Sequence, residues 1–314
     1  SRGDRPRNDR TSSPDSMSAP TVLVTGGSRG IGRAIALRFA REGSKVVVAA
    51  RNSVQLDAVV AEIEAAGGQG LAAQMNVRDH GSVEAAVWRA VEFCGGAIDL
   101  LVNNAGVFDV VPFEQLDVAT WRKTLEVNLD GVFRTGQEAA RRMIAAGTGG
   151  SIINIASMSG LIVNHPQFQA SYNTSKAAVI HLTKSLAGEW APYNIRFNSI
   201  SPGYMEGPMA GPFFEDPKYG GVWFDAVPMH RPGKPEELCP VAVLLAYGML
   251  FARIRMALLA AAVAAVVFVG WEWLMFLQYG DSHFLYARAV RSGIVSLRGI
   301  GLLGLGFISL LGGL

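Results

Sequence analysis

Short runs of apolar, mostly β-branched residues alternate with longer amphipathic stretches from Thr21 onward, and this alternation constrains the fold more than any other feature. The runs TVLVTG, KVVVAA and IDLLVNNAG have no polar face, which is typical of strands buried on both sides of a parallel sheet. Because helical stretches separate these runs, the helices must cover both faces of the sheet. The sequence therefore predicts an α/β fold with a doubly wound parallel sheet, a Rossmann-type three-layer sandwich.

The pattern also predicts the remaining elements. Further strands are expected at LAAQM, SIINIAS and NIRFNSIS, and helices over about 30–42, 120–145 and 171–190, with others following Ser53 and Ser82. The segment Pro202–Pro235 is rich in Gly, Pro and aromatic residues, so we expect it to form a mobile loop that covers the site. A short helix should begin near Glu236.

Composition divides the chain into three parts. Residues 1–19 are rich in Arg, Asp, Ser and Pro, which predicts a disordered tail. Residues 20–246 carry the alternating pattern and form the predicted dinucleotide-binding reductase domain. Residues 247–314 form an apolar tail: 253–278 has the length and composition of a membrane-type helix, and 299–314 is a second, shorter apolar segment.

The charge balance and the metal-ligating residue types exclude several classes of function. A formal net charge of +2, from 28 basic and 26 acidic residues, predicts no nucleic-acid partner. The two cysteines lie far apart, and the five histidines show no paired spacing, so we expect neither a disulfide framework nor a metal site. The expected compartment is the cytoplasm, with the apolar tail leaving membrane association on the cytoplasmic side open.

A glycine-rich turn lies between the first predicted strand and the first predicted helix. Glycines permit a tight turn and let the backbone approach a pyrophosphate, which would lie at the N-terminus of the helix. The position of this turn, rather than its composition alone, predicts dinucleotide binding. Its expected contact residues are Gly26, Ser28, Arg29, Gly30, Ile31 and Gly32.

The end of the second strand indicates which dinucleotide binds. Enzymes that prefer NAD usually place a carboxylate there for the ribose 2′-hydroxyl, whereas this chain has Ala49, Ala50 and Arg51. Arg51 and Arg29 together suit a 2′-phosphate, so the sequence predicts NADP(H). The alternative interpretation is that both arginines are ordinary solvated charges.

A tyrosine and a lysine four residues apart provide the candidate acid–base pair. On a helix, Tyr172 and Lys176 share one face, so the ammonium lies near the phenol. A phenol with its ordinary pKa of about 10 exchanges protons poorly near neutrality, and a nearby cation lowers that pKa. Such pairs are also common on helices for structural reasons, so the context must decide.

Taken together, these residues resemble the short-chain dehydrogenase/reductase family. The shared motifs occur in family order and include the TGxxxGxG turn, the NNAG run Asn103–Gly106, Asn128 in LEVNLDG, Ser157 after SIINI, YxxxK, and SPG at 201–203. The resemblance implies a catalytic tetrad. Tyr172 would be the general acid or base, Ser157 would bind the reacting carbonyl, Lys176 would bind the nicotinamide ribose and lower the pKa of Tyr172, and Asn128 would hold a water that connects Lys176 to solvent.

The resemblance also implies further cofactor contacts. These are Asn76, Val77, Asn104, Ala105, Gly106, Pro202 and Gly203, besides Tyr172 and Lys176 themselves. Two positions depart from the common pattern of the family. Asn76 stands where many relatives have Asp, and no Thr is present near Gly207 to contact the carboxamide.

Three functions are compatible with the motifs. The segment MSGLIVNHPQFQAS, with SPGYM, resembles the branch that reduces xylulose, sorbose, mannitol or arabinitol-type substrates, in which Asn164, His165, Gln167 and Gln169 would offer hydrogen bonds to hydroxyls. We therefore expect an oxidoreductase acting on a small sugar or polyol, forming a homo-oligomer as relatives do. The alternatives are a reductase of 3-oxoacyl or other lipophilic ketones, and an inactive NADP(H)-binding sensor or scaffold.

The C-terminal tail departs from the family pattern. Relatives continue with a last strand and a VDGG-like stretch, whereas here an apolar segment replaces that strand after Ala246. One interpretation is a membrane anchor that leaves the reductase domain cytoplasmic, in line with Arg253 and Arg255 before the apolar run. The other, which we favour slightly, is a fusion or gene-model artefact.

Overall fold

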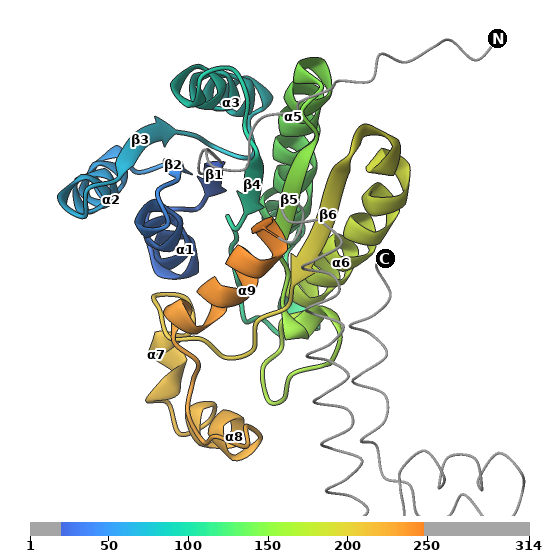
Figure 1. The fold of residues 1–314 in the computed structure, drawn as a ribbon. Helices are drawn as coiled ribbons and strands as arrows, with labels where there is room; N and C mark the ends of the chain where they lie inside the picture. The colour runs from blue at the N-terminus through green and yellow to red at the C-terminus, as the bar shows by residue number, and fades with distance from the viewer. Residues whose placement is uncertain (1–19, 248–314) are drawn as a thin grey trace, which may run out of the picture. The chain divides into compact units, whose positions relative to one another are not determined.

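The computed structural model describes residues 20–247 of the chain, and these residues form a doubly wound α/β domain (Figure 1). Six parallel strands make one sheet in the order β3-β2-β1-β4-β5-β6. The strand order reverses between β1 and β4, which is where ligands bind in sheets of this kind. The strands are β1 (Thr21–Thr25), β2 (Lys45–Ala50), β3 (Gln69–Gln74), β4 (Leu100–Asn103), β5 (Gly150–Ile155) and β6 (Ile195–Ile200).

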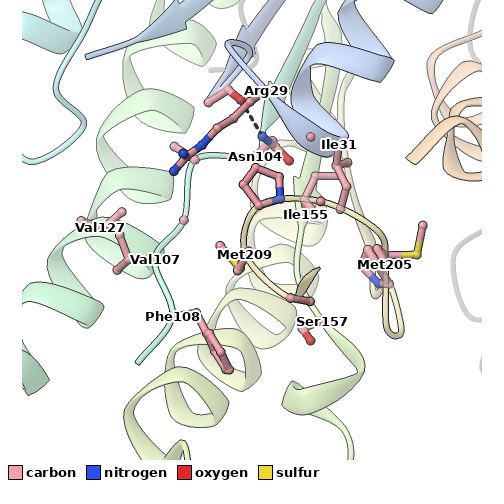
Figure 2. A pocket seen from close by; sticks show the side chains of 18 of the residues that line it. Arg29, Ile31, Asn104, Val107, Phe108, Val127, Ile155, Ser157, Met205 and Met209 are labelled. Atoms are coloured by element: carbon pink, nitrogen blue, oxygen red, sulfur yellow. Dashed lines mark hydrogen bonds between the residues drawn. The ribbon is translucent and has the colours of Figure 1, made fainter. Parts of the chain in front are cut away.

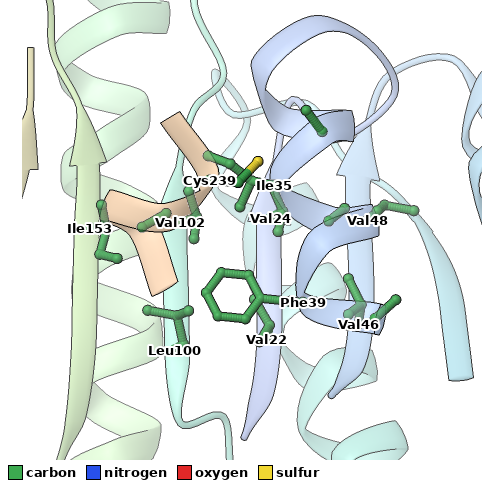
Figure 3. Close-up of a cluster of buried hydrophobic side chains, with 14 of the residues drawn as sticks. Val22, Val24, Ile35, Phe39, Val46, Val48, Leu100, Val102, Ile153 and Cys239 are labelled. Atoms are coloured by element: carbon green, nitrogen blue, oxygen red, sulfur yellow. The ribbon is translucent and has the colours of Figure 1, made fainter. Parts of the chain in front are cut away.

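Helices cover both faces of the sheet, as predicted. The strand residues alternate between the faces, so Val22 and Val24 of β1 pack on one side while Leu23 packs on the other. On the first face they contact α1 (Gly30–Arg41), α2 (Ser53–Ala65) and α9 (Pro235–Tyr247), with Phe39 at the centre (Figure 3). The second face is covered by α3 (His80–Cys94), α5 (Gly131–Ala146) and α6 (Ala170–Trp190).

Two predicted elements differ from the structure. The helix expected over about 120–145 is divided into α4 (Val118–Leu125), a π-helical turn at Glu126–Asp130, and α5. The predicted strand IDLLVNNAG ends at Asn103, because the next two backbone amides, of Asn104 and Ala105, donate hydrogen bonds to the Thr25 side chain instead of continuing the ladder. The covering segment, Pro202–Pro235, contains two short helices, α7 (Gly211–Phe214) and α8 (Gly220–Asp225).

Several predictions about the two ends of the chain lie outside the described residues. These are the disordered tail at 1–19, the membrane-type helix at 253–278, and the second apolar segment at 299–314. Within residues 20–247, no helix combines the length and the apolar content that crossing a bilayer needs. In the described residues, β6 is the edge strand of the sheet on the side opposite β3.

The glycine-rich turn is tied to β4 by a set of short contacts. Asn104 Nδ2 donates to the carbonyls of Thr25 and Gly26, at 3.1 Å each, and Thr25 Oγ1 accepts from the amides of Asn104 and Ala105 at 3.0 Å each. Helix α1 packs closely over this point, since a Cβ at Gly32 would lie 2.4 Å from both Asn104 Nδ2 and the Gly26 carbonyl oxygen. We name this set of contacts the Asn104 clamp.

The clamp predicts that Gly32 does not tolerate a side chain. Gly32→Ala should lower the free energy of unfolding by about 1–3 kcal/mol, because backbone atoms must move to make room. Gly188→Ala is the matched control, since it also places alanine in a helix but meets no atom within 4 Å. It should stabilise the fold by about 0.5–1 kcal/mol. Denaturant unfolding of both variants checks this, and equal effects would contradict the clamp.

Candidate active site

A cleft of about 700 Å³ opens at the carboxyl ends of the strands, beside the point where the strand order reverses. Figure 2 shows Arg29 and Asn104 toward one end of the cleft, and Phe108 and Ser157 toward the other. The cleft brings together nearly all of the residues that the sequence singled out. Those lining it are Gly26, Ser28, Arg29, Gly30, Ile31, Arg51, Asn76, Val77, Asn104, Ala105, Gly106, Ser157, Tyr172, Lys176, Pro202 and Gly203.

Four predicted residues do not line the cleft: Gly32, Asn128, and two of the predicted hydroxyl-binding residues, Asn164 and His165, whereas Gln167 and Gln169 do line it. Gly32 faces the Asn104 clamp, where its lack of a side chain allows α1 to approach β4. Asn128 is fully buried in the π-helical turn. Its Nδ2 donates to the Val107 carbonyl at 2.9 Å and to Ser175 Oγ at 3.0 Å, and its Oδ1 accepts from the Val107 amide at 2.8 Å. Both N–H groups of this side chain therefore hold protein atoms in place.

Tyr172, Lys176 and Ser157 meet at the end of the cleft where Phe108 lies. Tyr172 and Lys176 lie one turn apart on α6, and Lys176 Nζ is 5.6 Å from the centroid of the Tyr172 ring. Lys176 Nζ also donates to the Ile155 carbonyl at 2.7 Å, which fixes the ammonium against the end of β5. Ser157 follows β5 and is buried, with its hydroxyl accepting from the Ser159 amide at 3.1 Å. Two separate segments, α6 and the end of β5 with the residues that follow it, thus converge on one point.

Burial shifts the pKa of both members of the pair. Burial raises the pKa of the Tyr172 phenol, and a hydrogen bond with the Ser157 hydroxyl opposes that rise. Burial lowers the pKa of Lys176 to about 8. The sequence predicted that Lys176 would lower the pKa of Tyr172, whereas in the described residues burial has the largest effect on that pKa and the Ser157 hydrogen bond is what opposes it.

The end of the cleft at which Arg29 lies is basic. Arg29 and Arg51 are exposed there, and neither forms an ion pair with a carboxylate of residues 20–247. Arg78 also lines this end, but it is paired with Glu126 at 2.5 Å. Asn76 is turned into its own loop, where its Oδ1 accepts from the Arg78 amide at 3.2 Å. Sequence reasoning missed Arg78, although it lies only two residues beyond Asn76.

The covering segment supplies a wall that the sequence did not predict residue by residue. Seven of its members line the cleft with apolar or aromatic side chains, among them Met205 and Met209 (Figure 2) and Trp223 of α8. Phe108 links this wall to the acid–base pair, because its ring lies edge-on to Tyr172 at 5.3 Å and to Phe213 at 5.6 Å. No periodic signal marks these residues, since they belong to loops and very short helices.

The features of the cleft fit a dinucleotide. Gly26 and Gly30 have φ angles of +62° and +54°, which residues with a side chain rarely adopt. A Cβ at Gly26 would lie 2.9 Å from Ala105. The turn thus presents bare backbone at the N-terminus of α1, where phosphates bind. The two unpaired guanidinium groups at the same end suit a further phosphate.

Comparisons with known proteins agree with this geometry. The short chain dehydrogenase family matches residues 20–218. Galactitol 2-dehydrogenase (L-tagatose-forming) of Cereibacter sphaeroides is 38% identical over 225 residues, covering 72% of this chain and 87% of that enzyme. The 3beta-hydroxysteroid dehydrogenase 1 of Eggerthella lenta is 37% identical over 233 residues, covering 74% of this chain and 88% of that enzyme.

Solved structures give the same result. A gluconate 5-dehydrogenase from Burkholderia cenocepacia J2315, in complex with NADP and tartrate, has a TM-score of 0.68 at 35% identity, over 73% of this chain and 89% of that one. An NAD+-bound xylitol dehydrogenase has a TM-score of 0.68 at 33% identity, over 73% and 92%. Fold, motifs and relatives thus lead to one conclusion: this chain belongs to the short chain dehydrogenases, oxidoreductases that act on CH–OH groups with a nicotinamide cofactor.

Proposed function

We propose that this protein interconverts a small polyhydroxylated ketone and its alcohol with NADP(H), with the reductase domain spanning residues 20–246. The observation that carries the proposal is the convergence of Tyr172, Lys176 and Ser157 at one end of a cleft. Its other end holds a bare glycine turn and two arginines that pair with no carboxylate of residues 20–247. Relatives named for galactitol and gluconate support the substrate class.

The cofactor would lie along the cleft with its phosphates on the glycine-rich turn. Gly26 and Gly30 would give the pyrophosphate access to the backbone, and Arg29 and Arg51 would pair with the 2′-phosphate. Asn76 and Val77 would contact the adenine, Asn104 to Gly106 the adenosine side, and Pro202 and Gly203 the nicotinamide. When bound, the cofactor supplies or accepts the hydride, and its oxidised ring carries a positive charge.

The protein would supply the proton. In the reducing direction, Tyr172 donates its phenolic proton to the carbonyl oxygen while the Ser157 hydroxyl holds that oxygen by a hydrogen bond. Because burial raises the pKa of Tyr172 and lowers that of Lys176, the residues by themselves keep the phenol protonated and ready to donate. The phenolate that remains is stabilised by the nearby ammonium and by the charge of the oxidised cofactor.

The proton would return through Lys176. A Cβ at Gly106 would lie 3.4 Å from Asn128 Oδ1 and 3.8 Å from Lys176 Nζ, so the glycine leaves room between these two groups. We place the bridging water of this path there. Since both Asn128 N–H groups bind protein atoms, the residue would hold the water through its remaining acceptor capacity rather than as a donor.

A lipophilic ketone is the second candidate substrate. The cleft carries apolar side chains from Phe108, Met205 and Met209, and a relative of similar identity is named for a 3β-hydroxysteroid. A nucleotide-binding sensor would need no acid–base pair, and its intact arrangement argues against that class. These functions are separated by measuring how fast the full-length chain reduces L-sorbose, an acetoacetyl ester and a steroid ketone. The oxidation of NADPH reports each rate.

Replacing the phenol tests the proton donor. Tyr172→Phe should lower kcat by about 100-fold or more, because general acid catalysis is lost, while the Kd for NADPH changes little. Tyr193→Phe removes the hydroxyl of an exposed tyrosine beyond the end of α6 and serves as the control. Steady-state kinetics and fluorescence titration with NADPH provide the measurements. Undiminished turnover by Tyr172→Phe would remove Tyr172 from the mechanism.

Replacing the arginines tests the cofactor. Arg51→Ala and Arg29→Ala should each lower kcat/KM for NADPH by about 10- to 100-fold and leave that for NADH nearly unchanged, because each removes a charge-assisted bond to the 2′-phosphate. Arg122→Ala, an exposed position outside the cleft, is the control. A wild-type preference for NADH, or equal losses with both cofactors, would contradict the roles given to Arg29 and Arg51.

The charge of Lys176 is testable through stability. Burial lowers its pKa from 10.5 to about 8 in the folded protein. Between those pH values the unfolded chain binds more protons, so the free energy of unfolding gains from rising pH. The difference between wild type and Lys176→Met should be flat below about pH 8 and should then shift in favour of wild type up to about pH 10.5. Urea unfolding across this range gives the difference. Lys184→Met, an exposed lysine of the same helix, is the control, and a flat profile throughout would contradict the shift.

A further inference from the structure

A network of buried amide side chains lies behind the substrate end of the cleft. Its centre is Gln169, which is 3% exposed. The Nε2 of Gln169 lies within hydrogen-bond distance of three oxygen atoms, namely Ser159 Oγ at 3.1 Å, Asn164 Oδ1 at 3.2 Å and Asn173 Oδ1 at 2.8 Å. Three acceptors around one nitrogen fix the orientation of this amide, so its Oε1 faces the other way.

The orientation of Gln169 in turn fixes that of Gln167. Gln167 Nε2 donates to Gln169 Oε1 at 3.1 Å, so rotating the Gln167 amide would set two oxygens against each other. Its own Oε1 is therefore held in place as an acceptor. Gln167 lines the cleft and is 7% exposed, yet this Oε1 has no hydrogen-bond partner among the described residues.

The covering segment contributes a second buried group without a partner. Trp223 of α8 lines the cleft and is 1% exposed, and its Nε1 donates to no atom of residues 20–247. The indole is held by stacking on Tyr204, with ring centroids 4.4 Å apart and an angle of 10° between the planes. Tyr204 Oη accepts from Asn164 Nδ2 at 3.3 Å, which connects Trp223 to the same network as Gln167.

Among the described residues, the Gln167 acceptor and the Trp223 donor thus lack partners, and both side chains belong to the lining of the same cleft. Buried polar groups are nearly always paired in native proteins, because leaving one unpaired costs free energy. The two groups need opposite partners, and a hydroxyl is the common group that both donates and accepts. A hydrocarbon chain in the same place would leave both unpaired.

We propose that Gln167 and Trp223 select the substrate by its hydroxyl groups, with Gln167 Oε1 accepting from one hydroxyl and Trp223 Nε1 donating to a hydroxyl oxygen. This inference rests on the proposed function and narrows it to polyhydroxylated ketones. Rejection of apolar ketones follows, since a site built to pair with hydroxyls discriminates strongly against analogues that lack them.

The test compares two six-carbon 2-ketones, L-sorbose and 2-hexanone, with the full-length protein and NADPH. Gln167→Met keeps the length of the side chain but removes the acceptor, and Trp223→Phe keeps an aromatic ring on Tyr204 but removes the donor. Each should lower the ratio of kcat/KM for L-sorbose to that for 2-hexanone by about tenfold. Gln137→Met and Trp88→Phe, both outside the cleft, are the matched controls and should leave the ratio unchanged.

Using a ratio separates specificity from folding, because partial loss of folded protein lowers both rates equally. If wild type is active on both ketones and the ratio does not change in Gln167→Met and Trp223→Phe, the inference is overturned. A wild type that turns over neither ketone contradicts the proposed function instead. In that case the shift in Tm produced by galactitol and by 2-hexanol with NADP+ decides the inference: a preference for galactitol that both variants lose supports it, and equal shifts overturn it.

Discussion

The Asn104 clamp is the contact on which the site depends. One amide side chain from the end of β4 donates to two carbonyls of the turn after β1, and helix α1 packs against it through the bare face of Gly32. These contacts tie the carboxyl ends of the two strands together and fix the turn between β1 and α1. The cleft opens beside the point where the strand order reverses, and the glycine turn that lines it is positioned by the clamp, whose bonds to Thr25 Oγ1 also end β4.

Much of this architecture was predictable, because a repeating pattern of apolar residues in the sequence encodes it. Runs such as Val22–Val24 and Val46–Val48 can only be satisfied inside a covered sheet, and the glycine turn and the Tyr172–Lys176 spacing are local patterns in sequence. The π-helical turn around Asn128 was not predictable, since it depends on the contacts of its buried amide with Val107 and Ser175. Trp223 and Phe108 likewise enter the cleft through loops whose course no periodicity encodes.

The electrostatics could be anticipated only in part. Helical spacing correctly places an ammonium near the phenol, but the sign of the pKa change at Tyr172 is set by how completely the surroundings exclude water. A sequence gives the identity of a neighbour more readily than the depth at which the pair is buried. Here that depth keeps the phenol protonated and holds Lys176 near the point of losing its own proton.

Edge-to-face contacts run from Tyr172 through Phe108 to Phe213, and from there the rings of the covering segment continue to Trp223. The wall of the cleft is therefore in mechanical contact with the phenol that we propose as the proton donor. In the function that we propose, substrate choice and acid strength are therefore coupled: redesigning the wall for a bulkier ketone would also change how much water reaches the phenol, and with it the pH range of the enzyme.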